Sequence, residues 1–199
     1  MTGADVMAFQ KTHGNHLGRG LTVDGVIGPE TEWALAFQTL CQARREIVVM
    51  AQAYLGLTED PPASNTDPAG LIRSWLARAG AVGGDPWCAA FASWCLTAGL
   101  TPPVKVAGAQ ALGRRFPATT RPIAGDVMWY PLALGKGHCG IVIGTAANLV
   151  MTIEGNSANA VRCVRRDRGE LRFSRTVEDT AGTPPGIVPS VPPPPKGTR

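Results

Sequence analysis

The sequence predicts an α+β fold, because its helix-like segments come first along the main part of the chain and its strand-like segments follow. Three helical segments are expected, at 44–57, 69–79 and 86–98. Three strand-like runs come next, at 126–130, 140–144 and 149–153. A basic hairpin is expected over 160–175, with its turn at Arg168-Gly169. Elements segregated in this way predict helices packed on an antiparallel sheet.

A small helical unit is expected before this region, over residues 1–42. Apolar residues within MTGADVMAFQ indicate a short first helix. The sequence VDGVIGPETEWALAFQ follows, in which Asp24-Gly25 marks a turn and Pro29 marks the start of a second helix. The segment QARREIVVMAQAYLG then continues with helical periodicity and leaves no linker. The main domain is therefore expected over residues 44–178.

Composition allows one ordinary domain, or a domain of about 130 residues with a small companion. The chain has 199 residues, of which 44% are hydrophobic, and this excludes wholesale disorder. Residues 180–199 are the exception, because they hold seven of the 17 prolines and are expected to form a disordered, Pro-rich tail. No run approaches the ~18 apolar residues of a membrane helix, so no membrane insertion is expected. The first residues lack the features of a secretory signal, so synthesis in the cytoplasm is expected.

The formal net charge of +4 suits an anionic polymer as partner and is too small to indicate nucleic acid. Most of the late arginines lie in the expected hairpin. They are Arg162, Arg165, Arg166, Arg168, Arg172 and Arg175. Two interpretations of this run remain open: a solvated hairpin, or a surface that faces an anionic cell-wall polymer.

The cysteines are odd in number and form no CxxC pair, which argues against a disulfide framework and a structural zinc site. They are Cys41, Cys88, Cys95, Cys139 and Cys163. His13 and His16 lie three residues apart, but no carboxylate or thiol completes a ligand set beside them. We therefore expect no metal site and no cofactor.

Cys88 lies where a helix is expected to begin. Asp85 is a favourable N-cap residue and Pro86 a favourable first helical residue, so the thiol falls in the first turn. The positive end of the helix dipole lowers the pKa of a thiol and favours the nucleophilic thiolate. The negative charge of Asp85 opposes this effect, so a further partner is required. The alternative for Cys88 is a buried packing role, which is also what we expect of Cys95.

His138 and Glu154 are expected to face each other across two paired strands. If residues 145–147 close the hairpin, His138 lies directly opposite Glu154, with Cβ atoms about 5 Å apart. A carboxylate at that distance can hold one imidazole nitrogen while the other nitrogen faces a thiol. A single β-bulge would change this register. The same pairing puts small residues on the face of His138, which would let the helix bearing Cys88 approach closely.

Four fragments resemble the CHAP family, the cysteine- and histidine-dependent amidohydrolases and peptidases that are relatives of papain-like enzymes. In chain order they are PWCAAF, GDVMWY, GHCGIVIG and EGN, within residues 44–176. The resemblance implies a papain-like fold in which Cys88 is the nucleophile and His138 the general base and then acid. It implies that either Glu154 or Asn156 orients the imidazole, with Asn156 otherwise a helper.

The same resemblance implies acyl transfer, in which the thiolate attacks an amide carbonyl and water later releases the acyl group. The backbone N–H of Cys88 is expected to stabilise the oxyanion. Some CHAP enzymes bind calcium through an acidic loop before the nucleophile. The corresponding segment here, GAVGGD, offers only Asp85, so no calcium site is expected.

The fragment DGVIGPETEWALAFQ resembles the repeat of small peptidoglycan-binding domains, three-helix modules that hold cell-wall hydrolases on their substrate. The similarity covers about residues 4–40, and the alternative is a helical appendage that packs on the main domain. The two resemblances together imply a peptidoglycan hydrolase that cleaves an amide bond. That bond is either the N-acetylmuramoyl–L-alanine bond or a peptide cross-link. The partner is then bacterial peptidoglycan, reached after release through a separate phage pore or delivery by secretion machinery.

Two other functions remain open from the sequence. One is a non-catalytic wall-binding protein on a degenerate hydrolase scaffold. The other is a papain-like protease or deamidase that acts on soluble protein. Intact Cys88, His138 and Glu154 favour an enzyme over the first alternative, and the N-terminal unit favours the wall over the second.

Tryptophans and one aspartate have competing interpretations. Trp87, Trp94 and Trp129 could stack on sugar rings, although large aromatic residues more often belong to a core. Trp87, beside the nucleophile, is the best candidate for substrate binding. Asp126 could be a catalytic acid, but a loop-capping role is expected for an aspartate at the start of a strand.

Overall fold

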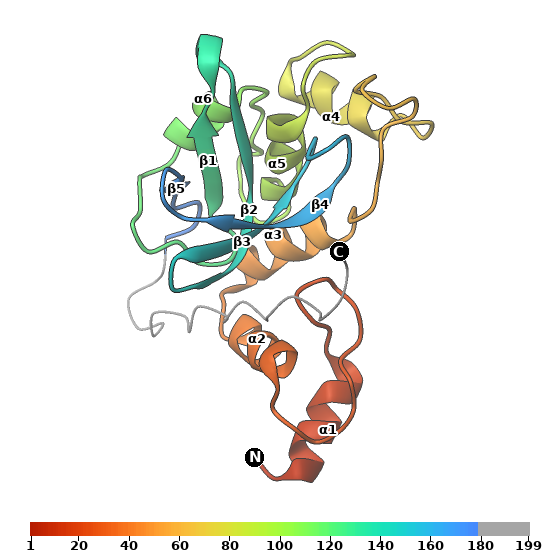
Figure 1. Ribbon diagram of the computed structural model, residues 1–199, viewed down its shortest axis with the longest axis vertical. Helices are drawn as coiled ribbons and strands as arrows, with labels where there is room; N and C mark the ends of the chain where they lie inside the picture. Colours follow the sequence, from red (N-terminus) through yellow and green to blue (C-terminus); the bar gives the residue numbers. More distant parts are fainter. Residues whose placement is uncertain (179–199) are drawn as a thin grey trace.

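The computed structural model describes residues 1–178, which form six α-helices, a short 3-10 turn (Ala133–Gly135) and five β-strands. The helices are α1 (Gly3–Thr12), α2 (Pro29–Gln38), α3 (Gln42–Gln52), α4 (Leu71–Ala79), α5 (Cys88–Leu96) and α6 (Ala109–Arg114). The strands are β1 (Val127–Pro131), β2 (Gly137–Ala146), β3 (Leu149–Glu154), β4 (Arg162–Asp167) and β5 (Arg172–Ser174). Figure 1 shows helices and sheet in separate layers, which confirms the α+β class. The expected Pro-rich tail, 180–199, lies outside the described residues.

Within residues 1–178, no helix has both the length and the apolar character needed to cross a membrane.

The five strands form one antiparallel sheet in the order β4-β3-β2-β1-β5. The expected basic hairpin is therefore wrong: β4 pairs with β3, and β5 pairs with β1 at the opposite edge. A flat sheet of this size would separate its edge strands by about 19 Å. Only residues 168–171 join those edges, and they are folded into a turn by the Leu171 N–H, which donates to Arg168 O. The sheet therefore curls until its two edge strands approach each other.

The strongly apolar face of the sheet covers the main core. Ile141 and Ile153 on this face share one buried cluster with Ile47 of α3, Phe91 of α5 and Leu112 of α6. The other face carries a smaller cluster, made of Met128, Val142, Val150 and Phe173. Helix α5 therefore packs on the larger apolar face, because this packing buries more apolar surface. The expected approach to the small-residue face is wrong.

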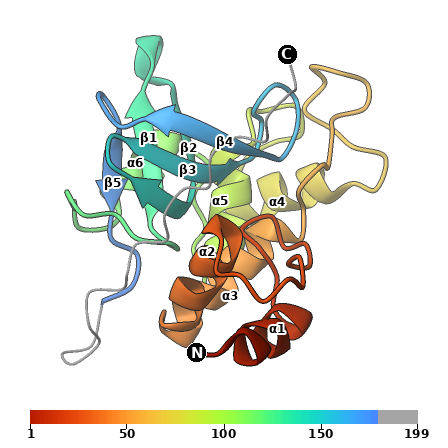
Figure 2. The same ribbon diagram turned by 60° about the horizontal axis from the view of Figure 1, so that its bottom comes forward.

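The N-terminal unit packs on the main domain through α2. Trp33 is buried, and its indole N–H donates to the carbonyl of Ile143 in β2 at 2.8 Å. Leu21 and Phe37 belong to the same core cluster as the sheet and α3. Helix α3 begins at Gln42 without a linker, so the expected boundary between 1–42 and 44–178 falls within its first turn. Figure 2 shows α1, α2 and α3 grouped at one end of the molecule.

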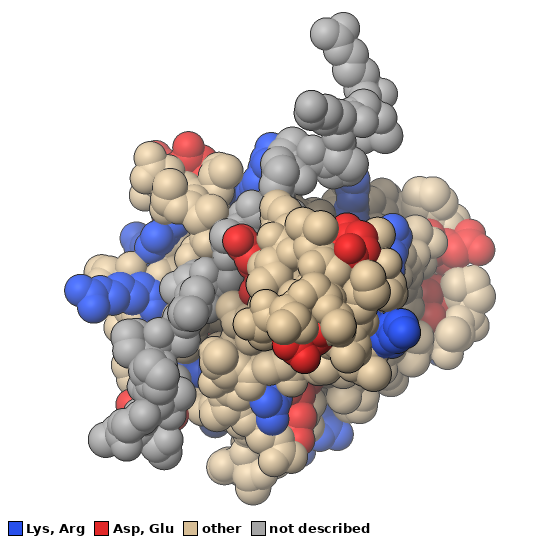
Figure 3. Space-filling view, turned by 90° about the horizontal axis from the view of Figure 1, so that it is seen from below, with Lys and Arg blue, Asp and Glu red and all other residues tan. Residues whose placement is uncertain are grey.

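The turn that follows α1 is organised by a buried glutamine. The amide of Gln10 accepts from the N–H groups of Asp24 and Gly25 and donates to Asp24 Oδ1 and Val26 O. This explains locally why the DGV segment forms the predicted turn before α2. Viewed from this end, acidic and basic side chains are interspersed over a largely uncharged surface (Figure 3).

A buried ion pair joins α3 to the start of β1. Asp126 is fully buried, and its Oδ1 lies 2.8 Å from Arg44 NH1. Its Oδ2 accepts from the Ile123 N–H at 3.0 Å, which confirms the expected loop-capping role. Oδ1 also accepts from the Thr176 N–H after β5. The pairing with Arg44 was not expected from sequence, and it ties three segments far apart in the chain to one carboxylate.

Replacing Gly113 with alanine is expected to destabilise the fold by about 1–3 kcal/mol. A Cβ at Gly113 would lie 2.4 Å from ring atoms of Trp129, so either α6 or the indole must move. Urea unfolding measures the loss. Gly108→Ala is the control, because a Cβ there meets only Ala111 at 3.6 Å. Equal stabilities of the two variants would contradict the close approach of α6 to the sheet.

Candidate active site

Cys88 is the first residue of α5, and its N-cap is Trp87. The helix thus begins two residues later than expected, and Asp85 is not its N-cap. The carboxylate of Asp85 instead accepts from the Val82 N–H at 3.2 Å, within the preceding loop. Cys88 therefore lies directly at the positive end of α5, where the first N–H groups have no acceptor in the helix.

His138 reaches Cys88 from the start of β2. The Nε2 atom of His138 lies 2.8 Å from Glu154 Oε2, which leaves Nδ1 as the nitrogen that can serve the thiol. The thiol also lies 4.0 Å from the carbonyl of Gly137, the residue before the histidine. The imidazole side chain is 13% exposed and that of Glu154 is fully buried. The structure therefore brings together three of the predicted site residues: Cys88, His138 and Glu154.

The register of β2 and β3 differs from the expected one. The connecting loop has two residues, 147–148, and a bulge lies between Val142 and Gly144. Val142 pairs with Thr152, and continuing this register places Gly140, not His138, opposite Glu154. His138 and Glu154 are on the same face, as predicted, but they are diagonal neighbours. The carboxylate passes over Gly140, where a Cβ would lie 2.6 Å from Glu154 Cγ.

Arg166 of β4 holds the carboxylate from the other side. Its Nε donates to Glu154 Oε1 and its NH2 to Oε2, both at 2.6 Å. Thr152 Oγ1 donates to Oε1 at 2.6 Å. The guanidinium also lies over the ring of Tyr130, at 5.3 Å from its centroid. Sequence interpretation placed Arg166 in a solvated or polymer-facing run and missed this role. One signal was available: Arg166, Glu154 and His138 all have even numbers, and even-numbered residues of these strands share one face of the sheet up to the bulge in β2.

The charges of the site alternate in sign from Arg166 through Glu154 and His138 to Cys88. Burial alone would raise the pKa of Glu154, but hydrogen bonds from Arg166, His138 and Thr152 lower it to about 2. Burial likewise opposes protonation of His138, yet Cys88 and Glu154 raise its pKa to about 9. At neutral pH this order favours an imidazolium beside a thiolate. Each buried charge is stabilised by a neighbour of opposite sign.

Both shifts also contribute to folding stability. The pKa of Glu154 is below its ordinary 4.5, so its ionised form stabilises the fold above that pH and loses this effect as pH falls through about 2. The pKa of His138 is above its ordinary 6.5, so its protonated form stabilises the fold below that pH and loses this effect as pH rises through about 9.

Cys139 is a second thiol at the site that sequence interpretation did not identify. It follows His138 on β2, points to the core face and is fully buried. Hydrogen bonding with Cys139 is the largest cause that lowers the pKa of Cys88, ahead of the imidazole. The interaction with Cys88 and burial raise the pKa of Cys139 well above its usual range, so it remains a neutral thiol. Cys139 can therefore donate to the Cys88 thiolate.

Alkylation by iodoacetamide is expected to show a reactive thiolate at Cys88. The pKa of Cys88 is lowered, so its labelling should remain fast as pH falls from about 9 to about 6. The labelling of an ordinary thiol slows about tenfold per pH unit over this range. Peptide mapping by mass spectrometry measures the rate at each cysteine. Cys163 is the internal control, since burial raises its pKa to about 11. A Cys88 rate that falls in parallel with that of Cys163 would contradict the ion pair.

Trp87 is not a substrate-binding residue in this structure. Its side chain is fully buried, and its indole N–H donates to Glu59 Oε1 at 2.8 Å. Its ring packs against Trp75 and Phe91. The expectation of sugar stacking is therefore wrong, because no face of the indole reaches the cleft. Glu59 is a buried carboxylate that sequence interpretation missed.

Asn156 does not orient His138. Its side-chain amide lies 3.0 Å from Asn65 Oδ1 and 3.3 Å from both Glu59 Oε1 and the backbone N of Trp87. These contacts connect the turn after β3 to the loop before Cys88. Of the two predicted alternatives, Glu154 is therefore the residue that holds the imidazole, and Asn156 braces the walls of the site.

A cleft of about 770 Å³ opens at the thiol. Cys88, His138 and Asn156 line it, together with Gln110 and the loop before β2. Glu154 lies behind His138 and does not line the cleft. A carbonyl placed at the thiol would meet the backbone N–H of Cys88 at the helix start, which is the donor expected for an oxyanion. The arrangement can therefore perform nucleophilic attack, proton transfer and oxyanion stabilisation.

The cleft at Cys88 is not lined by the other residues considered for ligand binding, which are Trp94, Trp129, His13 and His16. Trp129 is buried, and Trp94 is partly buried with its indole N–H donating to Tyr54. His13 stacks on Phe9, and His16 is buried, so they do not face a common ligand. In the described part of the chain, no three His, Cys, Asp or Glu side chains are grouped as they would be around a metal ion.

Neither the family models nor the curated proteins compared with this chain gave a match.

Proposed function

We propose that this protein is a peptidoglycan hydrolase that cleaves an amide bond by thiol acyl transfer. The observation that carries the proposal is the thiol of Cys88 at a helix start, beside an imidazole that a buried carboxylate holds at 2.8 Å. Cys88 and His138 line a cleft large enough for a peptide, and Glu154 lies behind the imidazole. Buried ion pairs of this composition activate a thiol for attack on a carbonyl. The CHAP resemblance of the four fragments around these residues supports the same chemistry.

The reaction would proceed in two halves. The Cys88 thiolate attacks the amide carbonyl carbon, and the backbone N–H of Cys88 stabilises the resulting oxyanion. The His138 imidazolium gives its Nδ1 proton to the leaving amine as the C–N bond breaks, which leaves a thioester. Neutral His138 then takes a proton from water, and the hydroxide adds to the thioester. The carboxylic acid leaves, and the thiolate–imidazolium pair is restored.

The choice of peptidoglycan as substrate depends on the N-terminal unit. Residues 1–42 resemble a wall-binding module, and a module joined to a hydrolase raises its local concentration on an insoluble polymer. A chain made in the cytoplasm would meet the wall after release through a phage pore or delivery by secretion machinery. The packing of α2 on the sheet would then hold wall-binding and catalytic surfaces in one rigid unit.

Digestion of purified sacculi tests the proposal. Wild-type protein is expected to release soluble fragments, and Cys88→Ala is expected to release none. Mass spectrometry then identifies the bond: an amidase frees the N-terminus of the stem peptide from the glycan, whereas an endopeptidase frees an amine within the cross-link. Wall binding without cleavage by either protein would support the non-catalytic alternative. Cleavage of soluble protein but not of sacculi would support the protease or deamidase.

A further inference from the structure

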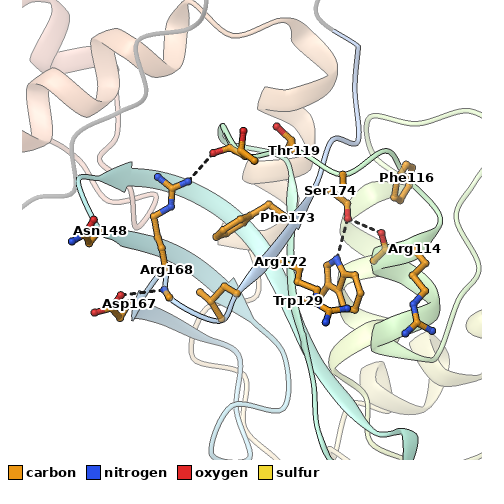
Figure 4. Close-up of a pocket in the computed structure, with 15 residues that line it drawn as sticks. Arg114, Phe116, Thr119, Trp129, Asn148, Asp167, Arg168, Arg172, Phe173 and Ser174 are labelled. Atoms are coloured by element: carbon orange, nitrogen blue, oxygen red, sulfur yellow. Dashed lines mark hydrogen bonds between the residues drawn. The ribbon is translucent and has the colours of Figure 1, made fainter.

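A second cavity, larger than the catalytic cleft, lies beside β5 and α6. Its volume is about 1100 Å³, and neither Cys88 nor His138 lines it. Trp129 and Phe173 form its apolar wall, and three arginines, Arg114, Arg168 and Arg172, stand around it (Figure 4). We call this cavity, defined by these five residues, the arginine pocket. The catalytic mechanism uses none of them.

The wall of the arginine pocket is rigid. Trp129 is 6% exposed, and its indole N–H donates to Ser174 Oγ at 3.0 Å. Ser174 Oγ in turn donates to the carbonyl of Gly113 in α6 at 2.6 Å. These bonds fix the indole between β1, β5 and α6. The pocket is therefore formed before any ligand arrives.

The three guanidinium groups lie over the aromatic rings. Arg172 and Arg114 lie 5.1 Å and 5.8 Å from the centre of the Trp129 ring. Arg168 lies 5.4 Å from the ring of Phe173, and its NH2 donates to the Thr120 carbonyl. A guanidinium stacked on a ring is oriented but keeps in-plane N–H groups for a ligand.

No carboxylate of residues 1–178 lies within ion-pair distance of these three arginines. Arg166 differs, because it is paired with Glu154. Asp167 is the single acidic residue in the lining, and its Oδ1 accepts from the Gly169 N–H. Figure 4 shows Asp167 beside Asn148, at the opposite end of the pocket from Arg114 and Trp129. The pocket thus concentrates positive charge that residues 1–178 do not neutralise through an ion pair.

Arg114 connects the arginine pocket to the catalytic cleft. Its side chain lines both cavities. Its NH2 donates to Gln110 Oε1 at 2.9 Å, and Gln110 lines the cleft and donates to the carbonyls of Gly135 and Lys136. A ligand that extends from the thiol past Gln110 therefore meets Arg114 next. One extended chain can occupy both cavities.

We propose that the arginine pocket binds the carboxylate groups of a peptide segment in the same polymer whose amide bond lies at Cys88. This rests on the proposed function, in which the polymer is peptidoglycan. Guanidinium groups bind carboxylates with paired, charge-assisted hydrogen bonds. The apolar wall of Trp129 and Phe173 would pack against the aliphatic parts of the peptide. The pocket would thereby set which stretch of an acidic peptide is presented to the thiol.

Calorimetric titration of the full chain carrying Cys88→Ala tests the pocket without cleavage. The probes are disaccharide-peptides released from sacculi by a muramidase, either with free carboxylates or with the same groups chemically amidated. The free form is expected to bind about tenfold more tightly. Arg114→Gln together with Arg172→Gln should remove this preference. Arg73→Gln together with Arg162→Gln removes two exposed charges outside the pocket; this matched control should keep the preference.

Several results would overturn the proposal. They are equal affinity for the free and amidated probes, an unchanged preference in the double variant, or tighter binding of poly(glycerol phosphate) or an oligonucleotide than of the free probe. Hydrolysis of sacculi, with Cys88 intact, separates this proposal from the proposed function. The double variant is expected to raise KM about tenfold. Cleavage by the double variant with an unchanged KM would reject the pocket alone. Absence of cleavage by wild-type protein would reject the proposed hydrolase, and the calorimetric titration would still test the pocket.

Discussion

Replacing Glu154 with glutamine is expected to lower kcat by about 10³- to 10⁴-fold. The carboxylate holds His138 Nε2 at 2.8 Å and accepts two hydrogen bonds from Arg166. In the variant, the single amide oxygen should turn to the guanidinium, and the amide NH2 would then face the imidazole. Nε2 must become an acceptor, so the ring proton moves to Nδ1, which can no longer take a proton from Cys88.

Kinetics on soluble wall fragments measure this loss, and circular dichroism confirms that the variant is folded. Glu154→Asp keeps the charge and should recover part of kcat, whereas Glu170→Gln removes an exposed carboxylate and should leave kcat at the wild-type value. Iodoacetamide labelling of Cys88 at about pH 6 should slow in Glu154→Gln, because the imidazolium is no longer stabilised. A low kcat with unchanged labelling would show that Glu154 acts on the fold and not on the imidazole.

The fold class and the grouping of Cys88, His138 and Glu154 could be predicted because they depend on short-range patterns. Helix and strand periodicity are local, and the segments around Cys88, His138 and Glu154 each carry their own signal. The parity of residue numbers along paired strands was enough to place His138 and Glu154 on one face, even though the loop length was wrong. A bulge and a shorter loop shift the register without changing that parity here.

The features that could not be predicted depend on contacts between distant segments. Arg166 reaches Glu154 only because β4 pairs with β3, and the sequence of a basic run does not show which strand it joins. The pairing of β5 with β1 is equally non-local, and it creates the arginine pocket. Trp87 was misjudged because its burial is decided by Trp75 and Glu59, which lie in other segments.

Replacing Asp126 with alanine is expected to destabilise the fold by about 3–5 kcal/mol, the largest stability loss that we predict. The substitution leaves the guanidinium of Arg44 buried without the carboxylate that lies 2.8 Å from it. It also removes the acceptor of the Ile123 and Thr176 N–H groups. Urea unfolding, followed by circular dichroism, measures the change in the free energy of unfolding.

Two further variants separate the buried charge from the other contacts of Asp126. Asp60→Ala removes an exposed carboxylate and should change stability by no more than about 0.5 kcal/mol. Adding Arg44→Met to Asp126→Ala removes the buried guanidinium that has lost the carboxylate of Asp126, so the double variant should be more stable than Asp126→Ala alone. The double variant could instead be less stable than both Asp126→Ala and Arg44→Met. In that case the loss comes from packing and hydrogen bonds, and the burial of Arg44 does not depend on Asp126.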